Sequence, residues 1–378
     1  MKTYGIGIVG AGNISSAYLQ LAQLFKGLEI RAIADISLEA AERRGLEFGV
    51  DAMSVDALLA HPLVDVVVNL TVPSAHFAVS MRAIEAGKHV YSEKPFVLSL
   101  AEGKALKASA NARGLMVGSA PDTFLGGAHQ QARYIIDGGQ LGTITSGTCH
   151  VMSAGMEHWH PNPDFFFQPG AGPVLDLGPY YVTNLINLIG PVQRVAAFTG
   201  MGRRERVATA PGPMQGSVIK VGTPTTIHGV LEFVSGAIIS IGASWDVRAH
   251  GHHNMELYGT EGSIFVPDPN YFGGQVETAI GDAPRSAAAS YVHPFSKANQ
   301  DLETAQPIAN YRAAGLADMV AAIEERRPPR CGIDIALHAV DVMTALLISG
   351  ETRAVQQLAT TCVRPAALAP EMAQALLR

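Results

Sequence analysis

Residues 4–15, YGIGIVGAGNIS, decide the fold expected of this chain. The β-rich apolar run Tyr4–Val9 stops at a glycine turn, a helical pattern follows, and a second apolar run, Ile30–Ala34, ends at Asp35. Strand, glycine turn, helix, strand and acid in this order are typical of the opening βαβ unit of a dinucleotide-binding fold. The alternative is a glycine turn that binds no nucleotide, and the matching context on both sides disfavours it.

The turn residues have distinct physical uses in holding a dinucleotide. Gly10 permits the tight turn, and Gly12 lets the backbone approach a pyrophosphate at the helix N-terminus. Asn13 and Ile14 open that helix and complete the expected cofactor contacts. Ser15 takes the third glycine position and is small enough for close packing of helix on strand.

Asp35 predicts which nicotinamide cofactor is used. Its carboxylate would accept hydrogen bonds from the adenosine ribose and repel a 2′-phosphate, so we expect NAD and not NADP. Arg43 and Arg44 follow in the next helical pattern and would soften this preference.

Length and composition bound the class of protein. The 378 residues, 48% hydrophobic, favour two domains, which we place at 1–121 and 122–378. A net charge of −6 and the lack of long basic runs argue against a nucleic-acid or membrane-surface partner. Three widely spaced cysteines indicate a reducing compartment, and no apolar segment reads as a membrane span, so we expect a cytoplasmic protein.

Hydrophobic periodicity predicts two different kinds of domain. The βα alternation continues to Pro121, which predicts an α/β Rossmann domain with a parallel sheet. Hairpin signals at Ser235-Gly236 and near Thr260 then predict an α+β domain with a large, mostly antiparallel open sheet. Residues 267–307 are expected to be loop, helices are expected at 311–325 and 333–349, and the tail after Gly350 is left unassigned.

Several motifs along nearly the whole chain resemble the glucose–fructose oxidoreductase / inositol dehydrogenase (Gfo/Idh/MocA) family. They are Gly10–Ile14, Asp35, Thr71–His76, Glu93-Lys94-Pro95 and Gly172–Gly178. The resemblance implies that Thr71, Pro73 and His76 line the nicotinamide half of an NAD site next to Glu93. It also implies that Lys94 stands beside the nicotinamide and the substrate, and that Asp176 belongs to the catalytic group.

Lys94 has a physical reason to be functional even without the resemblance. It lies at the carboxyl end of a predicted parallel strand, where ligands of open α/β sheets bind. A partly desolvated lysine near a cationic ring should have a lowered pKa and help to ionise a substrate hydroxyl. The alternative is a solvated lysine at a strand end.

Asp176 and Tyr180 are four residues apart at an expected helix start, so their side chains would share one face. The commonest pattern of the family has histidine at the second position, where it carries the proton. Tyr180 departs from that pattern and leaves two possibilities open: a lysine-assisted tyrosine that takes the substrate proton, or a pocket residue that donates one hydrogen bond.

The loop before Asp176 is expected to wall a substrate pocket. His158, Trp159, His160 and Phe166 combine aromatic faces with polar groups, which suits a sugar. An equally weighted alternative is that the Phe165–Phe167 run fills the core between domains. Asp122 follows the last strand of the first domain and is expected either near the cleft or in a simple linker turn.

The spacing of the histidines does not indicate a metal site. The apolar residues of the antiparallel sheet indicate contacts between copies of the chain. The five histidines His158, His160, His250, His252 and His253 lack metal-ligand spacing, so no metal is expected. The same-face apolar sets Ile227, Leu231 and Phe233, with Ile239 and Ile241, are expected to form an exposed face for a homodimer or homotetramer.

These patterns predict an NAD-dependent dehydrogenase acting on a secondary hydroxyl or ketone of a sugar, polyol or glycoside. Lys94, Asp176 and Tyr180 would move the proton. Two alternatives remain: a redox-assisted glycoside lyase or hydrolase that recycles NAD, and a non-catalytic NAD-linked sensor.

Overall fold

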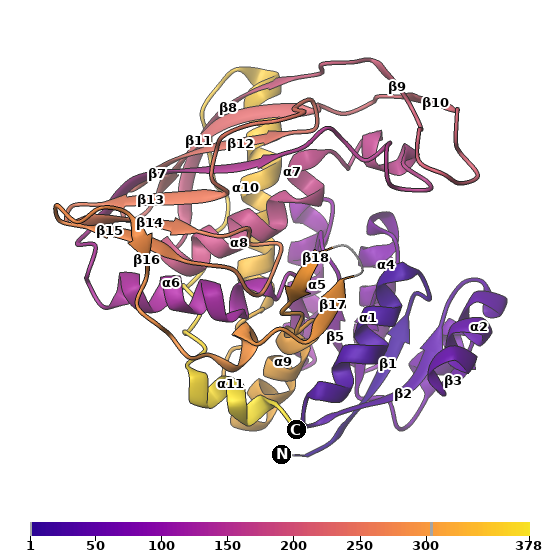
Figure 1. Ribbon diagram of the computed structural model, residues 1–378. Coiled ribbons are helices and arrows are strands. Elements are labelled where there is room, and N and C mark those ends of the chain that lie inside the picture. Colours follow the sequence, from indigo (N-terminus) through magenta and orange to yellow (C-terminus); the bar gives the residue numbers. More distant parts are fainter. Residues whose placement is uncertain (1, 303–304) are drawn as a thin grey trace.

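A computed structural model describes residues 2–302 and 305–378 of the chain (Figure 1). Within this described part, the first sheet has six parallel strands in the order β3-β2-β1-β4-β5-β6. The second sheet has nine strands in the order β16-β15-β14-β13-β7-β12-β11-β8-β19. In the second sheet β7 and β12 pair in parallel, and the other adjacent strands pair antiparallel. The expected fold class is therefore confirmed.

The first sheet and its helices follow the expected βα alternation. The strands are β1 (Tyr4–Val9), β2 (Leu28–Ala34), β3 (Asp51–Met53), β4 (Val66–Asn69), β5 (His89–Ser92) and β6 (Val117–Ser119). The helices are α1 (Asn13–Leu21), η1 (Ala22–Leu24), α2 (Leu38–Phe48), α3 (Val55–Ala60), α4 (Pro73–Glu85) and α5 (Leu100–Ala112).

Local capping explains why several of these helices begin where they do. Ser37 accepts the amide of Ala40 at 3.3 Å, and Ser54 caps α3 in the same way. At the start of α5, Ser99 and Glu102 form a complete capping box. These starts agree with the sequence, because capping depends on neighbouring residues.

The second domain contains more irregular structure. Its large sheet comprises β7 (Ile144–Met152), β8 (Val192–Gly200), β11 (Thr226–Phe233), β12 (Ile238–Ser244), β13 (Met255–Gly259), β14 (Gly262–Val266), β15 (Glu277–Ile280), β16 (Ser286–Ala287) and β19 (Gln356–Gln357). Two small hairpins are β9 (Glu205–Val207) with β10 (Val218–Lys220), and β17 (Gln300–Leu302) with β18 (Ala305–Ile308). The helices are η2 (Thr123–Leu125), α6 (Gly127–Asp137), η3 (Asp164–Phe167), α7 (Pro173–Asp176), α8 (Gly178–Ile189), η4 (Pro294–Ser296), α9 (Ala314–Glu325), α10 (Ile333–Thr352) and α11 (Pro370–Leu376).

The apolar sheet residues predicted to form an exposed dimer face are buried instead. Ile227, Leu231, Phe233, Ile239 and Ile241 belong to the core, each at 3% exposure or less. Helices α8 and α10 pack on this side of the sheet (Figure 1). The sheet's apolar side therefore points inward, and side chains from the alternate positions, such as Phe198, Val230 and Ile238, are exposed.

Two further expectations need correction. Residues 267–307 contain β15, β16, η4 and β17 and most of β18, although the sequence suggested loop; residues 303–304 of this segment lie outside the described part. The unassigned tail forms β19 and α11. Both segments contain short elements that are stabilised by pairing with distant strands or by packing on distant helices. Local hydrophobic periodicity therefore does not predict them.

The expectation that the chain has no helix long and apolar enough to span a membrane was wrong. α10 meets that test by length and composition. However, 67% of its apolar window is buried inside the protein, where it packs against α8 and β8. Its apolar residues are therefore those of a core helix.

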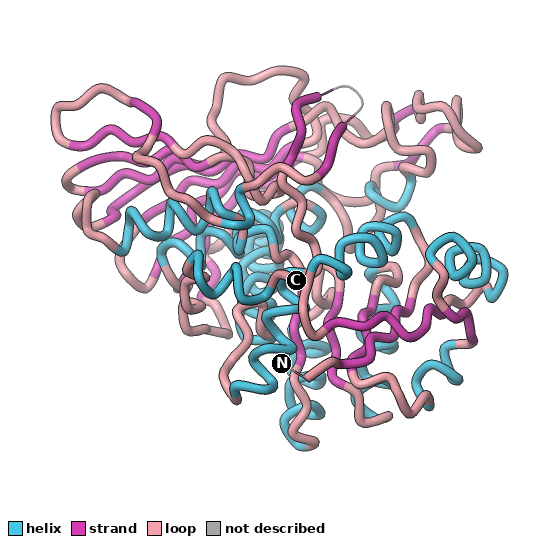
Figure 2. The backbone as a smooth tube through the Cα atoms, turned by 60° about the horizontal axis from the view of Figure 1, so that its bottom comes forward, coloured by secondary structure: helices cyan, strands magenta, loops and turns pink. Residues whose placement is uncertain are grey.

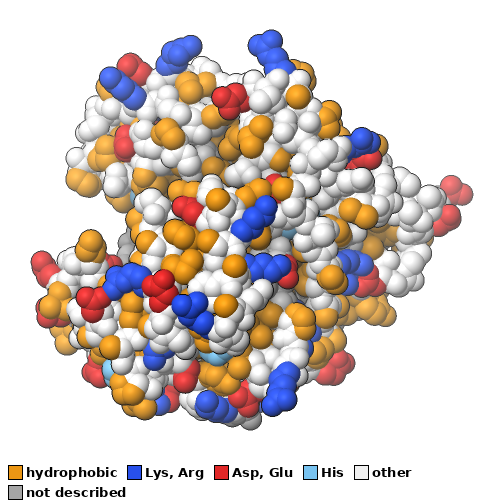
Figure 3. Space-filling model, turned by 180° about the vertical axis from the view of Figure 1, so that it is seen from behind, with side chains coloured by type: hydrophobic (Ala, Val, Ile, Leu, Met, Phe, Trp, Pro, Cys, Tyr) orange, Lys and Arg blue, Asp and Glu red, His pale blue; other side chains and the backbone are white. Residues whose placement is uncertain are grey.

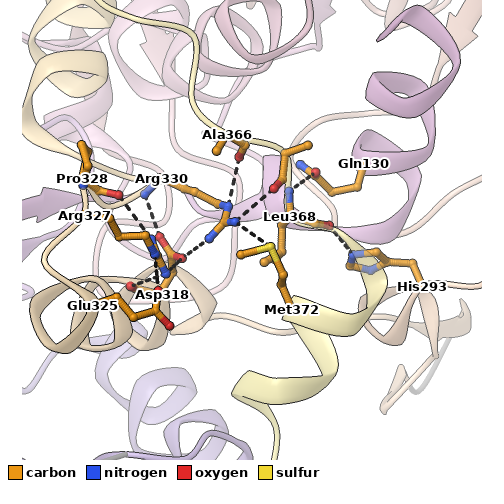
Figure 4. Close-up of polar contacts among 11 residues, drawn as sticks. Gln130, His293, Asp318, Glu325, Arg327, Pro328, Arg330, Ala366, Leu368 and Met372 are labelled. Atoms are coloured by element: carbon orange, nitrogen blue, oxygen red, sulfur yellow. Dashed lines mark hydrogen bonds and ion pairs between the residues drawn. The ribbon is translucent and has the colours of Figure 1, made fainter. Parts of the chain in front are cut away.

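A buried ion pair ties the C-terminal tail to the rest of the protein (Figure 4). The Arg330 guanidinium pairs with Asp318 of α9, and its backbone amide donates to the same carboxylate at 2.7 Å. Arg330 also donates to the carbonyl oxygens of Ala366 and Ala367 at 3.0 Å. Because each polar group is paired, the tail is held in one path toward α11.

That path brings both chain ends to the first domain. The amide of Lys26 donates to the carbonyl of Leu376 at 2.8 Å, and that of Arg378 donates to Leu24 at 2.9 Å. Figure 2 shows the two termini near each other. Helices α9 and α11 share a hydrophobic core with β1 and α1. The first domain is thus completed by C-terminal segments, while the boundary at residue 121 stays a prediction.

The surface is indented between the two lobes. In Figure 3 the lobe of the antiparallel sheet lies above that of the parallel sheet, with a hollow between them at one side. The carboxyl ends of β1, β4 and β5 carry the glycine turn, Thr71 and Lys94. In an open α/β sheet, ligands bind at this edge.

Candidate active site

The turn after β1 has the shape of a dinucleotide cradle. Gly10 has φ +111°, and a Cβ there would lie 2.6 Å from the backbone of Leu70. α1 starts at Asn13 with no side-chain cap at Gly12, so its first amides are free to meet an anion. A Cβ on Gly12 would meet nothing within 4 Å, which leaves space for the pyrophosphate there.

Asp35 lies directly beside this turn. Its Oδ2 accepts the amide of Ala11 at 2.7 Å, and its Oδ1 accepts the amide of Ser37 at 2.9 Å. Arg44 lies across the same turn, with Nη2 3.4 Å from the carbonyl oxygen of Gly12. A carboxylate and a guanidinium therefore both face the region expected to hold the adenosine ribose.

Thr71 and His76 form hydrogen bonds that fix the loops at the carboxyl edge of the parallel sheet. The hydroxyl of Thr71 donates to Asn69 Oδ1 at 2.7 Å. His76 is 1% exposed, and its ring nitrogens lie 2.7 Å from the Pro95 carbonyl and 2.9 Å from that of Thr71. Burial lowers the pKa of His76. The ring therefore braces the loop after Lys94, and its expected contact with the nicotinamide stays a prediction. Pro73 is the first residue of α4.

Lys94 and Asp176 meet across the two domains. Lys94 Nζ lies 2.8 Å from Asp176 Oδ1 and 2.8 Å from the backbone carbonyl oxygen of Asp176. The two side chains are 17% and 19% exposed, so the pair is largely shielded but still partly accessible. The structure thus brings together two residues 82 positions apart that the sequence selected separately.

The expected lowering of the Lys94 pKa is not found in the protein alone. Burial, the largest single influence, would lower the pKa, but interactions with Asp176, Tyr180 and Glu93 together outweigh burial and raise it. Lys94 is therefore an ammonium group that donates hydrogen bonds at neutral pH. The expectation considered desolvation and a cationic ring but not a carboxylate at hydrogen-bonding distance.

Asp176 and Tyr180 do not lie on one continuous helix. Asp176 ends the short α7, Leu177 interrupts the helix, and Tyr180 lies in the first turn of α8. Tyr180 still reaches the site, because Lys94 Nζ lies 5.4 Å from the centre of its ring. No hydrogen bond of the Tyr180 hydroxyl is found within the described residues. The lysine, the carboxylate and the phenol therefore form one group.

Sequence reasoning missed Arg312 and Tyr18, which complete this group around Glu93. Arg312 Nη1 lies 2.9 Å from Glu93 Oε1, and the Tyr18 hydroxyl donates to the same oxygen at 3.0 Å. The other oxygen, Oε2, accepts the amide of Lys94 at 2.9 Å. Burial alone would raise the pKa of Glu93, but Arg312 and Lys94 lower it. Glu93 is thus an ionised anchor for the backbone that carries Lys94.

The backbone directly after Arg312 has an uncommon conformation. Ala313, the next residue, has φ +82°, a conformation that costs a non-glycine residue about 1 kcal/mol or more. Burial alone would lower the pKa of Arg312, but interactions with Tyr180 and Glu93 raise it. A signal was available in the sequence, since Arg312 and Asp318 are the charged residues of the otherwise uncharged segment 308–323.

Asp122 lies under the site and not on its surface. It is fully buried, and its Oδ2 accepts the amide of Gly315 at 3.1 Å. Burial raises the pKa of Asp122 to about 6. Neither the expected substrate contact nor the simple linker turn describes this residue, which joins the first domain to the start of α9.

The loop before Asp176 divides into an exposed part and a buried part. His158 and Trp159 are exposed, and the rings of Trp159 and His160 pack edge to face. Phe166 is buried and packs with Trp245 in a small separate core. Phe166 and Phe167 therefore fill a core inside the second domain, whereas Phe165 is exposed. The predicted sugar contacts of His158, Trp159 and His160 stay predictions.

His250, His252 and His253 lie in the segment between β12 and β13, and His150 lies in β7. The rings of His150 and His252 stack with their centres 3.9 Å apart, and His250 lies next to His252. Among residues 2–302 and 305–378, no group of three or more His, Cys, Asp or Glu side chains is arranged to hold a metal ion.

Comparison with family models identifies the chain. Residues 4–120 match the model described as "Oxidoreductase family, NAD-binding Rossmann fold", and residues 129–265 match the "GFO/IDH/MocA C-terminal domain". The chain belongs to the Gfo/Idh/MocA family of oxidoreductases. It is therefore an NAD-binding oxidoreductase with the two domains of that family.

Characterised members of the Gfo/Idh/MocA family resemble the chain over most of its length. Levoglucosan dehydrogenase of Pseudarthrobacter phenanthrenivorans is 26% identical over 292 residues, 70% of this chain and 73% of its own. The scyllo-inositol 2-dehydrogenase (NAD(+)) of Bacillus subtilis is 26% identical over 264 residues, 68% of this chain and 72% of its own.

Solved structures share the fold of this chain. The apo form of levoglucosan dehydrogenase superposes with a TM-score of 0.81 at 21% identity, covering 96% of this chain and 100% of its own. At this identity the likeness concerns the fold alone. The chemistry of this family member must therefore be argued from its own residues.

Proposed function

We propose that this protein is an NAD-dependent dehydrogenase that oxidises a secondary hydroxyl of a sugar, polyol or glycoside to a ketone, or catalyses the reverse reduction. The observation that carries the proposal is the Lys94–Asp176 pair, at 2.8 Å, beside Tyr180 at the carboxyl edge of the parallel sheet. Relatives named as dehydrogenases of levoglucosan and scyllo-inositol support the substrate class.

The residues present fit a nicotinamide dinucleotide. The free amides at the start of α1 would hold the pyrophosphate, and Asp35 would hold the adenosine ribose, which favours NAD. Glu93 and the backbone around Thr71 would lie near the nicotinamide end. When bound, NAD supplies the acceptor for the hydride that leaves the substrate carbon.

Side chains of the protein would transfer the proton of the substrate hydroxyl. In the reductive direction, the Lys94 ammonium hydrogen-bonds the carbonyl oxygen and donates a proton to it as the hydride arrives. In the oxidative direction, the hydroxyl proton passes to neutral Lys94 or to the Tyr180 phenolate as the C–H bond breaks. Asp176 orients Lys94 and stabilises its charged form.

Two properties of the whole protein are also proposed. The exposed side of the antiparallel sheet, which includes Phe198, Val230 and Ile238, would be the contact between copies of the chain in a homodimer or homotetramer. Cys149, Cys331 and Cys362 are buried and free, which supports the proposed cytoplasmic location.

A substrate screen tests the function. The purified protein is mixed with NAD and a panel of sugars, polyols and glycosides, and both NADH absorbance and product release are followed. Accumulation of NADH is expected. Release of an aglycone without NADH would instead indicate the NAD-recycling lyase, and tight NAD binding with no turnover would indicate a sensor.

A further inference from the structure

A second polar cavity lies at the other end of the loop that leads to Asp176. Its volume is about 190 Å³. Its lining includes His158, Arg203, Arg206, Trp245 and Arg248. A cavity of this size holds several waters or one small polar group.

Arg206 is fixed at the base of this cavity by a buried network. Its side chain is 2% exposed; Nη1 lies 2.7 Å from Glu157 Oε1, and Nη2 pairs with Asp246. The same two nitrogens also donate to the carbonyl oxygens of Ala154 and Trp245, at 3.2 and 3.1 Å. The guanidinium is therefore held rigidly, as a preformed binding site requires.

Two buried donors at this cavity have no partner in the described protein. They are Nε of Arg206 and the indole Nε1 of Trp245, whose side chain is fully buried. Leaving such a donor unpaired costs about 1–3 kcal/mol. Both residues belong to the cavity lining, and no acceptor among the described residues reaches either N–H group.

The charge around the cavity is positive. Arg203 and Arg248 are exposed at its rim and form no ion pair within the described residues. Asp246 is the one carboxylate in the lining, and its Oδ2 already accepts the hydroxyls of Thr225 and Thr226 at 2.6 and 2.7 Å. The cavity lining thus contains three arginines and one carboxylate, Asp246, which already accepts hydrogen bonds from the protein.

Glu157 does not change this balance. It pairs with Arg206 from outside the cavity lining, and one of its oxygens has no partner among the described residues. Counting its charge, the cluster of Arg203, Arg206, Arg248, Asp246 and Glu157 still carries a net positive charge.

We propose that this cavity binds an oxyanion: a carboxylate, sulfate or phosphate group. Rigidly held N–H donors recognise such anions, and so do arginines without an ion-pair partner, such as Arg203 and Arg248 in the described structure. The anion is either free or an acidic group carried by the substrate, and the second possibility rests on the proposed function. His158 lines this cavity, and Trp245 packs on Phe166 and Phe167 of the same loop, so a ligand here lies beside the loop that leads to α7.

Tryptophan fluorescence measures binding without any turnover. The chain has two tryptophans, so Trp159→Phe leaves Trp245 as the reporter next to the cavity. Sodium sulfate and inorganic phosphate are titrated against chloride at constant ionic strength. A saturable change in emission is expected with both oxyanions but not with chloride.

Charge reversal at the rim tests the assignment. Arg203→Glu with Arg248→Glu, in the same background, should weaken oxyanion binding at least about tenfold, because two charge-assisted contacts are lost. Arg204→Glu is the matched control, since Arg204 is an exposed neighbour that does not line the cavity. Thermal unfolding of all variants checks that the fold is kept. Absence of saturable binding, or equal weakening by Arg204→Glu, would overturn the proposal.

Kinetics then distinguish the source of the anion. If the acid belongs to the substrate, Arg203→Glu with Arg248→Glu in the protein that keeps Trp159 lowers kcat/KM for a uronic acid or sugar phosphate about tenfold, while kcat/KM for a neutral sugar is unaffected. If the anion is free, binding is lost in the variant but the ratio of acidic to neutral kcat/KM stays the same. Failure of every sugar to reduce NAD would reject the proposed function and leave the fluorescence result intact.

Discussion

Lys94 Nζ lies 2.8 Å from both the Oδ1 and the backbone carbonyl oxygen of Asp176. One residue follows β5 of the first domain and the other ends α7 of the second. The ammonium group therefore bridges the two domains at the sheet edge where the cofactor and the substrate are expected to meet.

Lys94→Ala should lower kcat by about 10²–10⁴-fold, the range for a positioned proton-transfer group. NAD affinity should change much less, since Lys94 contacts Asp176 and not the glycine turn. Steady-state kinetics and NAD titration measure the two effects. Lys104→Ala, at an exposed position of α5, is the control. Equal losses of NAD binding and rate would make Lys94 a cofactor anchor only.

Asp176→Asn should move the pH profile of the oxidative reaction. The carboxylate raises the pKa of Lys94, so the neutral amine forms only at high pH. Without that charge, burial dominates and the pKa falls, and the limb where kcat/KM rises with pH shifts to lower pH. Asp176→Glu, which keeps the charge, should leave the limb near its original position. An unchanged limb in Asp176→Asn would show that Lys94 does not accept the proton.

Tyr180→Phe decides between the two roles left open for this phenol. If Tyr180 takes the substrate proton, removing its hydroxyl should lower kcat by at least about 10²-fold. Tyr180→His should then recover part of the rate, because imidazole also carries protons near neutral pH. Near-normal kcat with a raised KM in the Phe variant would assign Tyr180 to substrate binding.

NAD should be preferred over NADP by several kcal/mol in kcat/KM, because Asp35 would face a 2′-phosphate. Asp35→Ser should reduce this preference. Arg44→Gln in the Asp35→Ser background should restore part of it, since Arg44 lies 3.4 Å from Gly12 O and would pair with the phosphate. The kcat/KM ratio for the two cofactors is the measurement, and comparable values in the unmodified protein contradict the prediction.

Arg312→Met should destabilise the fold by about 3 kcal/mol, because Glu93 would keep a buried charge without its guanidinium partner. Chemical denaturation measures the change. In the double variant Glu93→Gln with Arg312→Met, stability should largely return, since the buried charge is gone. If the double variant is as unstable as the sum of the two single variants, the pair is not coupled.

The sequence was sufficient to predict those structural features that depend only on residues close to one another in the chain. The glycine turn at Gly10, the cap of α2 at Ser37 and the capping box of α5 follow from local chemistry, and the structure has all three. Lys94 and Asp176 were selected from motifs, each at its own place in the chain. Periodicity also separated the parallel sheet from the antiparallel one.

Tertiary structure decided how distant groups meet, and this changed the chemistry. Asp176, together with Tyr180 and Glu93, reverses the expected shift in the Lys94 pKa, because their combined attraction for the ammonium group outweighs burial. The contact of Arg312 with Glu93 spans 219 positions and has no local pattern. The buried side of the antiparallel sheet was likewise set by α8 and α10, since alternation along a strand defines two sides but does not say which one the helices will cover.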